Sequence, residues 1–292
     1  MTADRAATSD PSPPGSGPAR DDPVGPVPHA LAVCRRGRWS PLPACLAEAA
    51  GSALLVLTAV TAFVVTSTSG APAAAWPLHL RLTLIGCAMG GVVVAVAVSP
   101  LGRASGAHLN PAVSVFQWTR GRMSGRDALG YVLFQLGGSV VGAVVGRLVW
   151  GGRAVEVRDA VVQPAACCGT VVTAGAEAAS TVLLVVVLAA AQRLDRPRVT
   201  PWLLGGLTAA LIVTTGALTG AGVNPVRNFG PQLLSGTHEF FWVYLLSPIA
   251  GAVVAGALAR RRTPLAVVLR SRRRHRRCRR SRAAGASTGR SG

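Results

Sequence analysis

Long apolar runs fill the middle of the chain, from residue 44 to residue 259, and short turns that carry arginine separate them. The runs are rich in Val, Ala, Leu and Gly, and most approach the ~20 residues that an α-helix needs to cross the ~30 Å hydrocarbon core of a bilayer. A soluble core does not require runs of this length. The pattern therefore predicts an all-α membrane protein with six transmembrane helices, over residues 44–67, 82–98, 128–150, 173–192, 202–218 and 240–259.

The first and fourth predicted spans resemble each other, which indicates an internal duplication. LAEAAGSALLVL at 46–57 and GAEAASTVLLVV at 175–186 share Ala-Glu-Ala-Ala followed by Leu-Leu-Val. Repeat one then covers residues 44–150 and repeat two residues 173–259, each with three spans. Because three is odd, the second copy enters the membrane from the opposite side, so we predict an inverted repeat of two three-helix halves.

The duplication places Glu48 and Glu177 at equivalent positions inside spans. A carboxylate within a bilayer is costly and usually faces the protein interior, where it has a partner. We expect the two glutamates to fix a loop or to line a pathway. The alternative is an interfacial acid near a helix start, which the helix dipole favours.

Each half also contains an Asn-Pro pair between its second and third spans, at Asn110-Pro111 and at Asn224-Pro225. Asn is a strong helix N-cap, and Pro is favoured at the first helical position. The helices that begin there, over residues 110–119 and 224–234, reach only ~15 Å, which is half of the hydrocarbon core. We therefore predict two re-entrant half-helices that enter from opposite sides and meet in the middle of the membrane.

The basic residues other than histidine are all arginines, and they are unevenly distributed. With six spans, the arginines before span one, before span three, between spans four and five and after span six fall on one side. Cytoplasmic loops carry the excess of positive charge in membrane proteins. We expect a multi-pass protein of the cell membrane, in contact with lipid, with both termini in the cytoplasm.

The two ends of the chain differ from its middle. Residues 1–40 are polar and Pro-rich, and residues 261–292 contain the run RSRRRHRRCRRSR, so we predict a disordered cytoplasmic segment at each end. The basic tail fits a signal that holds the C-terminus in the cytoplasm. Binding of anionic lipid or nucleic acid is the alternative, and nucleic acid is not the partner we expect.

The sequence lacks the features of an enzyme or a metal site. Its six cysteines are scattered without the C-x-x-C spacing that suggests zinc. The predicted spans contain no set of nucleophile, base and orienting group. We expect no enzymatic activity, no bound metal and no cofactor.

Four segments, with the two glutamates, give the chain a family resemblance. SGAHLNPAVS, TGAGVNPVRNFGP, YVLFQLGGSVVGAVVG and WVYLLSPIAGAVVAGA look like parts of the aquaporin, or major intrinsic protein, family, and the resemblance covers residues 41–260. It implies a channel domain of six tilted helices and two half-helices, with one pore in each subunit of a homotetramer.

The resemblance also implies roles for individual residues. It places a group of six at the pore centre: Asn110, Pro111, Ala112, Asn224, Pro225 and Val226. Arg227 matches the arginine of the outer constriction, although an arginine reaching from a helix end to the interface is the alternative. His108, Glu48 and Glu177 would support the re-entrant loops. The remaining constriction positions fall on Ala221, Ile212 and Gly90, with Cys87 in place of Gly90 if the loop after span two is longer than usual.

The second motif departs from the first at Val226, where the first copy has Ala112. Packing between two half-helices is tight, so two extra methyl groups should separate or shift them slightly. We expect this change to leave a working pore.

The constriction predicts which solutes pass. Its residues other than Arg227 are small or apolar, span five has no histidine as in water-specific members, and the two aromatics of glycerol facilitators are missing. Two helix N-termini aimed at one point repel cations and tolerate neutral solutes. We expect a wide passive channel for water and small neutral solutes such as glycerol, urea, ammonia or an undissociated metalloid acid, with protons and ions excluded.

Two other classes of function fit parts of the pattern. An ion-coupled secondary transporter also uses inverted repeats and broken helices, but it normally needs an acidic or carbonyl-rich ion site, for which only Glu48 and Glu177 are available. A membrane-anchored binding protein could act through the arginine-rich tail, and truncation after residue 262 would then abolish its function.

Overall fold

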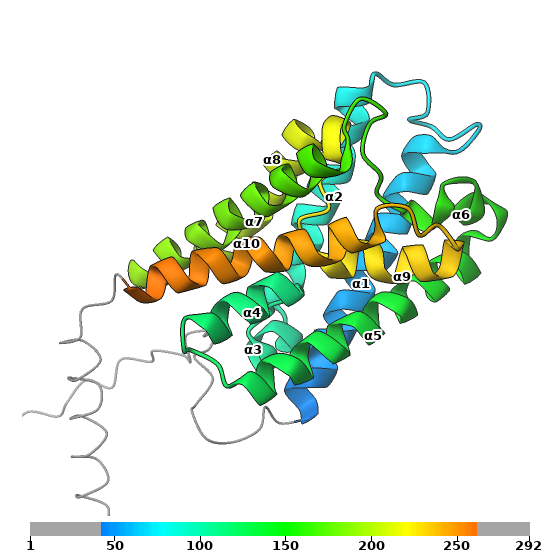
Figure 1. Cartoon of the computed structure of the whole chain (residues 1–292). Coiled ribbons are helices and arrows are strands. Elements are labelled where there is room, and N and C mark those ends of the chain that lie inside the picture. Colours follow the sequence, from blue (N-terminus) through cyan, green and yellow to red (C-terminus); the bar gives the residue numbers. More distant parts are fainter. Residues whose placement is uncertain (1–41, 262–292) are drawn as a thin grey trace, which may run out of the picture.

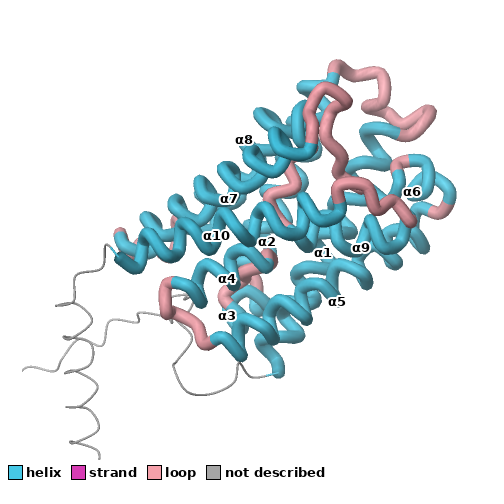
Figure 2. The backbone as a smooth tube through the Cα atoms, in the orientation of Figure 1, coloured by secondary structure: helices cyan, strands magenta, loops and turns pink. Residues whose placement is uncertain are grey.

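A computed structural model describes residues 42–261, and this part of the chain consists of helices joined by loops, with no strands (Figures 1 and 2). Its elements are α1 (Leu42–Ser67), α2 (Leu78–Val98), α3 (Pro100–Ser105), α4 (Pro111–Thr119), α5 (Gly125–Trp150), α6 (Gly152–Glu156), the 3-10 helix η1 (Arg158–Ala160), α7 (Thr170–Arg193), α8 (Thr200–Thr219), α9 (Pro225–Ser235) and α10 (Phe241–Arg261). The predictions for the Pro-rich head and the arginine-rich tail lie outside the described residues.

Six of these helices are long and apolar enough to cross a membrane, as the hydrophobic runs predicted. They are α1, α2, α5, α7, α8 and α10, and each begins and ends within a few residues of its predicted span. They run side by side at a tilt to one another in Figure 1. The described part of the chain is therefore an all-α bundle with six candidate spans.

The two half-helices are α4 and α9, and both begin at the expected Asn-Pro pair. The side-chain oxygen of Asn110 accepts from the backbone N–H of Ala112 at 2.8 Å, and that of Asn224 accepts from Val226 at 3.0 Å. In each case Pro occupies the first turn, where its missing N–H costs nothing. Local sequence alone thus accounts for where both half-helices start.

The helices pair in the way that a duplication requires. Within the halves, α1 packs against α5 and α7 packs against α10, while α2 packs against α8 across the halves. Gly138 of α5 lies so close to α1 that a Cβ there would meet the carbonyl oxygen of Ala49. Gly251 of α10 stands in the same relation to Ala178 of α7. The two halves of the inverted repeat therefore make equivalent helix–helix contacts.

The bundle has two ends, which differ in the connections that form them. The η1 end consists of the connections 68–77, 151–169 and 236–240. The α4 end consists of α3 and the connections 120–124 and 194–199. The half-helix α4 extends from the middle of the bundle to the α4 end, and α9 extends from the middle to the η1 end (Figure 1).

Because α5 approaches α1 closely, we expect the same substitution to have different effects on stability at two neighbouring glycines of α5. Gly138→Val should lower the free energy of unfolding by about 3 kcal/mol, because its new side chain meets the backbone of α1 rather than a movable side chain. Gly137→Val is the matched control, since a Cβ at Gly137 meets nothing within 4 Å. Thermal unfolding of the detergent-purified proteins measures both, and equal melting temperatures would contradict the packing described.

Candidate functional site

The loops that lead into the half-helices have the same unusual backbone. Gly106, Ala107 and Leu109 have φ angles of 89°, 48° and 50°, and Gly220, Ala221 and Val223 have 77°, 52° and 51°. Left-handed backbone at residues other than glycine is strained and persists only where the surroundings hold it. The two loops therefore need strong and equivalent supports.

Glu48 supplies that support in the first half. Its carboxylate accepts from the backbone N–H groups of His108 at 2.9 Å and Leu109 at 2.7 Å, and from the side-chain amide of Gln135 at 2.7 Å. Glu48 is fully buried, so these three donors replace the water that a carboxylate would otherwise keep.

Glu177 does the same in the second half. Its carboxylate accepts from the backbone N–H groups of Gly222 at 3.0 Å and Val223 at 2.5 Å, and from the hydroxyl of Thr219 at 2.8 Å. The equivalent acids thus bind equivalent backbone groups of the two loops. Both are 0% exposed, and neither lines the central cavity.

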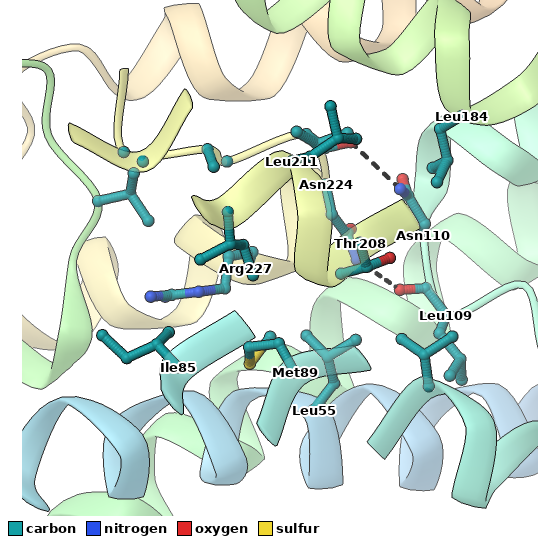
Figure 3. Close-up of a pocket in the computed structure, with 18 of the residues that line it drawn as sticks. Leu55, Ile85, Met89, Leu109, Asn110, Leu184, Thr208, Leu211, Asn224 and Arg227 are labelled. Carbon is teal, nitrogen blue, oxygen red and sulfur yellow. Dashed lines mark hydrogen bonds between the residues drawn. The ribbon is translucent and has the colours of Figure 1, made fainter. Parts of the chain in front are cut away.

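The two asparagines join the halves at the centre of the bundle. The Asn110 amide donates to the carbonyl oxygen of Val223 at 3.2 Å, and the Asn224 amide donates to the carbonyl oxygen of Leu109 at 2.8 Å. These are the dashed contacts in Figure 3. Each amide nitrogen carries a second N–H, and both asparagines line the cavity. The geometry therefore presents two donors at the middle of an otherwise apolar passage.

A cavity of about 340 Å³ runs past both asparagines. Its wall is mostly aliphatic, as Leu55, Met89, Leu184 and Leu211 illustrate in Figure 3. Among residues 42–261, no aspartate or glutamate belongs to the lining, whereas two arginines, Arg81 and Arg227, do. An apolar wall with a few fixed donors favours small solutes that have no charge.

Arg227 lies one turn into α9 and is 5% exposed. It donates from Nη1 to the carbonyl oxygen of Ala160 at 2.7 Å, and its guanidinium carbon lies 5.0 Å from the centre of the Phe63 ring. The next residue, Asn228, accepts from the backbone N–H of Val162 at 2.7 Å. The 157–163 segment therefore holds the arginine in place.

An ion pair stabilises this segment, and nothing in the sequence pointed to it. The guanidinium of Arg147 binds the carboxylate of Asp159, with Nε to Oδ1 at 3.0 Å. Asp159 is fully buried, and it stands in η1, whose three residues, Arg158–Ala160, all have positive φ angles. The pair thus holds a strained turn whose last residue presents its carbonyl to Arg227.

The predicted constriction residues divide into two groups. Ile212 and Ala221 line the cavity together with Arg227. Gly90 does not, so its prediction is wrong: it faces α8, where a Cβ would meet the carbonyl oxygen of Gly205. The alternative, Cys87, is exposed and does not line the cavity either.

Ile85 is one of the α2 residues that line the cavity, and it lies toward the end where Arg227 lies (Figure 3). Counting back from Asn110 missed it because the short helix α3 lengthens the connection between α2 and α4. The four-residue spacing of apolar side chains along α2 is the signal that identifies it, since Ile85, Met89 and Val93 share one face and all line the cavity.

The other predicted residues lie on or just behind the lining. His108 lines the cavity, and its Nδ1 is 3.0 Å from the hydroxyl of Ser114. Pro111, Ala112, Pro225 and Val226 are buried but do not reach the lumen. Both methyl groups of Val226 lie in the core cluster that includes Leu55 and Ala143, so the effect of this residue on the pore centre stays a prediction.

Two half-helices that meet beside a lined cavity, inside a bundle of membrane-length helices, define a multi-pass membrane channel. The family model for the major intrinsic proteins matches residues 36–259. The chain belongs to this family, whose members are channels for water or small solutes.

Individual proteins support the same assignment. The chain is 30% identical to Aquaporin NIP1-2 of Oryza sativa subsp. japonica over 71% of this chain and 67% of that protein. It is 32% identical to Aquaporin TIP4-2 of Zea mays over 73% of this chain and 82% of that protein. For several relatives the match spans less than two thirds of their length, as with maize Aquaporin TIP1-2 at 63%.

Among solved structures, the aquaglyceroporin from Plasmodium falciparum superposes with a TM-score of 0.64 at 22% identity. The match covers 78% of this chain and 99% of that one. This superposition shows a shared fold.

The ion pair between Arg147 and Asp159 yields a prediction about the stability of the protein. Asp159→Asn should destabilise the protein by about 3 kcal/mol, the low end for loss of one partner of a buried pair, because Arg147 is one-third exposed. Adding Arg147→Gln should recover part of that loss. A double-mutant cycle of unfolding free energies measures the coupling, and additive effects would contradict it.

Proposed function

We propose that the chain forms a passive pore for water and small neutral solutes, including glycerol, urea, ammonia or an undissociated metalloid acid, and that the pore excludes protons and ions. The observation that carries this proposal is the pair of capped half-helices whose N-terminal asparagines meet on an aliphatic cavity. A neutral solute can accept hydrogen bonds there and gives up little hydration energy.

Ion exclusion follows from the charges around the cavity. Each half-helix N-terminus contributes about half a positive charge at the centre. Arg227 adds a full charge toward the η1 end, and no carboxylate in the lining offsets it. A cation therefore meets repulsion without a compensating ligand, while an anion loses its hydration to an aliphatic wall.

The proposed constriction consists of Ile85, Ile212, Ala221 and Arg227. One guanidinium among two isoleucines and an alanine gives a hydrogen-bond donor on one side and hydrocarbon on the other. This combination suits solutes that carry both hydroxyl or amide groups and carbon. The fold shared with a protein described as an aquaglyceroporin supports glycerol as one such solute.

The remaining residues have supporting roles in this proposal. Glu48 and Glu177 fix the two re-entrant loops, and His108 orients the first loop through Ser114. The protein would assemble as a homotetramer in the cell membrane with both termini in the cytoplasm, so that the η1 end faces outward. The arginine-rich connections at the α4 end support that orientation.

An ion-coupled transporter is less well supported. Glu48 and Glu177 are the acids that such a mechanism would use, yet both are fully buried and each already accepts three hydrogen bonds. Neither reaches the cavity where a coupling ion would bind.

Stopped-flow light scattering on proteoliposomes tests the proposed function. We expect fast osmotic water flux, permeability to glycerol and urea that does not saturate, and no dependence on a proton or sodium gradient. Liposomes of the same lipid without protein give the background. Water permeation with complete exclusion of glycerol and urea would contradict the wide pore, and saturable flux driven by a gradient would contradict passive transport.

The role of Ile85 is testable with one neighbour as its control. Ile85→Phe should lower glycerol permeability about tenfold by narrowing the constriction, since small changes of pocket size change discrimination by this order. Water permeability should fall much less. Cys87→Phe places the same ring on the exposed side of α2 and should leave both unchanged. Equal effects of the two variants on glycerol permeability would contradict the assignment of Ile85 to the constriction.

A further inference from the structure

Three arginines converge at the α4 end of the bundle, away from the cavity. Arg120 caps the C-terminus of α4, Arg122 follows it, and Arg193 is the last residue of α7. The Nη1 atoms of Arg120 and Arg122 both donate to the side-chain oxygen of Gln192, at 2.9 and 3.0 Å. Residues from the two halves of the chain thus build one cationic cluster.

The charge of this cluster is not balanced within the described part of the chain. None of the three arginines pairs there with a carboxylate. Burial, together with the nearby charges of Arg122 and Arg193, lowers the pKa of Arg120 to about 10, and burial and Arg193 lower the pKa of Arg122. Both groups remain charged at neutral pH, so the repulsion between them persists.

Gln192 also leaves the cluster short of acceptors. Its amide oxygen must face the two guanidinium groups, because the opposite orientation would point donors at donors. The amide nitrogen is consequently buried without a hydrogen-bond partner in the part of the chain that the structure describes. One neutral oxygen therefore serves two arginines, while a further donor is unsatisfied, which costs free energy in a partly buried site.

We propose that the cluster of Arg120, Arg122, Gln192 and Arg193 binds a phosphate group. Guanidinium groups match phosphate oxygens in fork geometry, and a phosphate supplies both the negative charge and the several acceptors that the cluster lacks. The chemistry is shared by the headgroup of an anionic phospholipid and by free phosphate.

The surroundings favour the lipid headgroup. The connection that follows Arg193 exposes Leu194 at 70% and Val199 at 46%, so hydrocarbon and cationic groups lie on neighbouring residues. This combination occurs where a protein meets the boundary of headgroups and acyl chains. Arg193 is also the last residue of the membrane-length helix α7, and the ends of such helices meet the headgroup region.

A bound phosphate would stabilise the first half-helix. The guanidinium of Arg120 lies 5.0 Å from the ring of Phe116, which belongs to the same core cluster as Val113 of the cavity wall. Fixing Arg120 therefore fixes the end of α4 opposite to Asn110. The phosphate site is independent of which solute the pore conducts.

Thermal unfolding of the purified full-length protein tests the site with defined probes. Phosphatidylglycerol should raise the melting temperature in mixed micelles, with phosphatidylcholine as the reference lipid. Inorganic phosphate, compared with chloride at equal ionic strength, forms the second arm. A response to phosphatidylglycerol alone identifies the lipid as the source, and a response to both identifies free phosphate as a ligand too. No response in either arm overturns the proposal.

Two variants and a control separate this site from general positive charge. Arg122→Gln should weaken the half-maximal response to phosphatidylglycerol about tenfold, the scale of one hydrogen bond between charged groups. Gln192→Glu places a carboxylate between the arginines, so it should raise the melting temperature without ligand and abolish the lipid response. Arg198→Gln changes an exposed arginine of the same end and should leave the response intact. Equal losses in Arg122→Gln and Arg198→Gln, or a lower melting temperature for Gln192→Glu, overturn the proposal.

Discussion

The rest of the structure depends on two buried carboxylates that satisfy the backbone of two irregular loops. Inside a bilayer, each N–H group that lacks a helical partner must find another acceptor. Glu48 and Glu177 provide those acceptors for residues 108–109 and 222–223. Because the loops are held in strained, left-handed conformations, the half-helices begin at fixed points, and their asparagines can reach each other across the centre.

The two halves are closely similar at the centre of the bundle and differ more toward its ends. Equivalent glutamates, loops and asparagines form the middle, as an inverted duplication requires. One turn into the half-helices the copies differ, because Val113 of α4 corresponds to Arg227 of α9, and both line the cavity. The duplication therefore builds the two matching loops and half-helices, and Arg227, present in one copy only, places a positive charge at one end of the cavity.

The arginines near the half-helices differ in how they are satisfied. Arg227 is buried but has a fixed carbonyl acceptor, which the ion pair of Arg147 and Asp159 holds in place. Arg120 and Arg122 share one amide oxygen. The first arrangement gives one guanidinium group its own carbonyl acceptor, whereas the second gives two guanidinium groups a single amide oxygen. An arginine that has its own acceptor within the chain serves to stabilise the structure, whereas arginines that share one acceptor are candidates for binding an anionic ligand.

The sequence by itself determined the six spans, the starts of both half-helices and the duplication, because run length, helix caps and repeated residues are local properties of the chain. It also identified Asn110, Asn224, Ile212 and Ala221, which line the cavity.

Only the tertiary structure decided that Ile85 and not Gly90 faces the lumen, since the register of α2 depends on its packing against Gly205 of α8. Likewise, the carbonyl of Ala160 meets Arg227 across 67 residues, and the two arginines that follow α4, Arg120 and Arg122, meet Gln192 across 72 and 70 residues. Contacts over such separations are fixed by how helices pack, which no local pattern records.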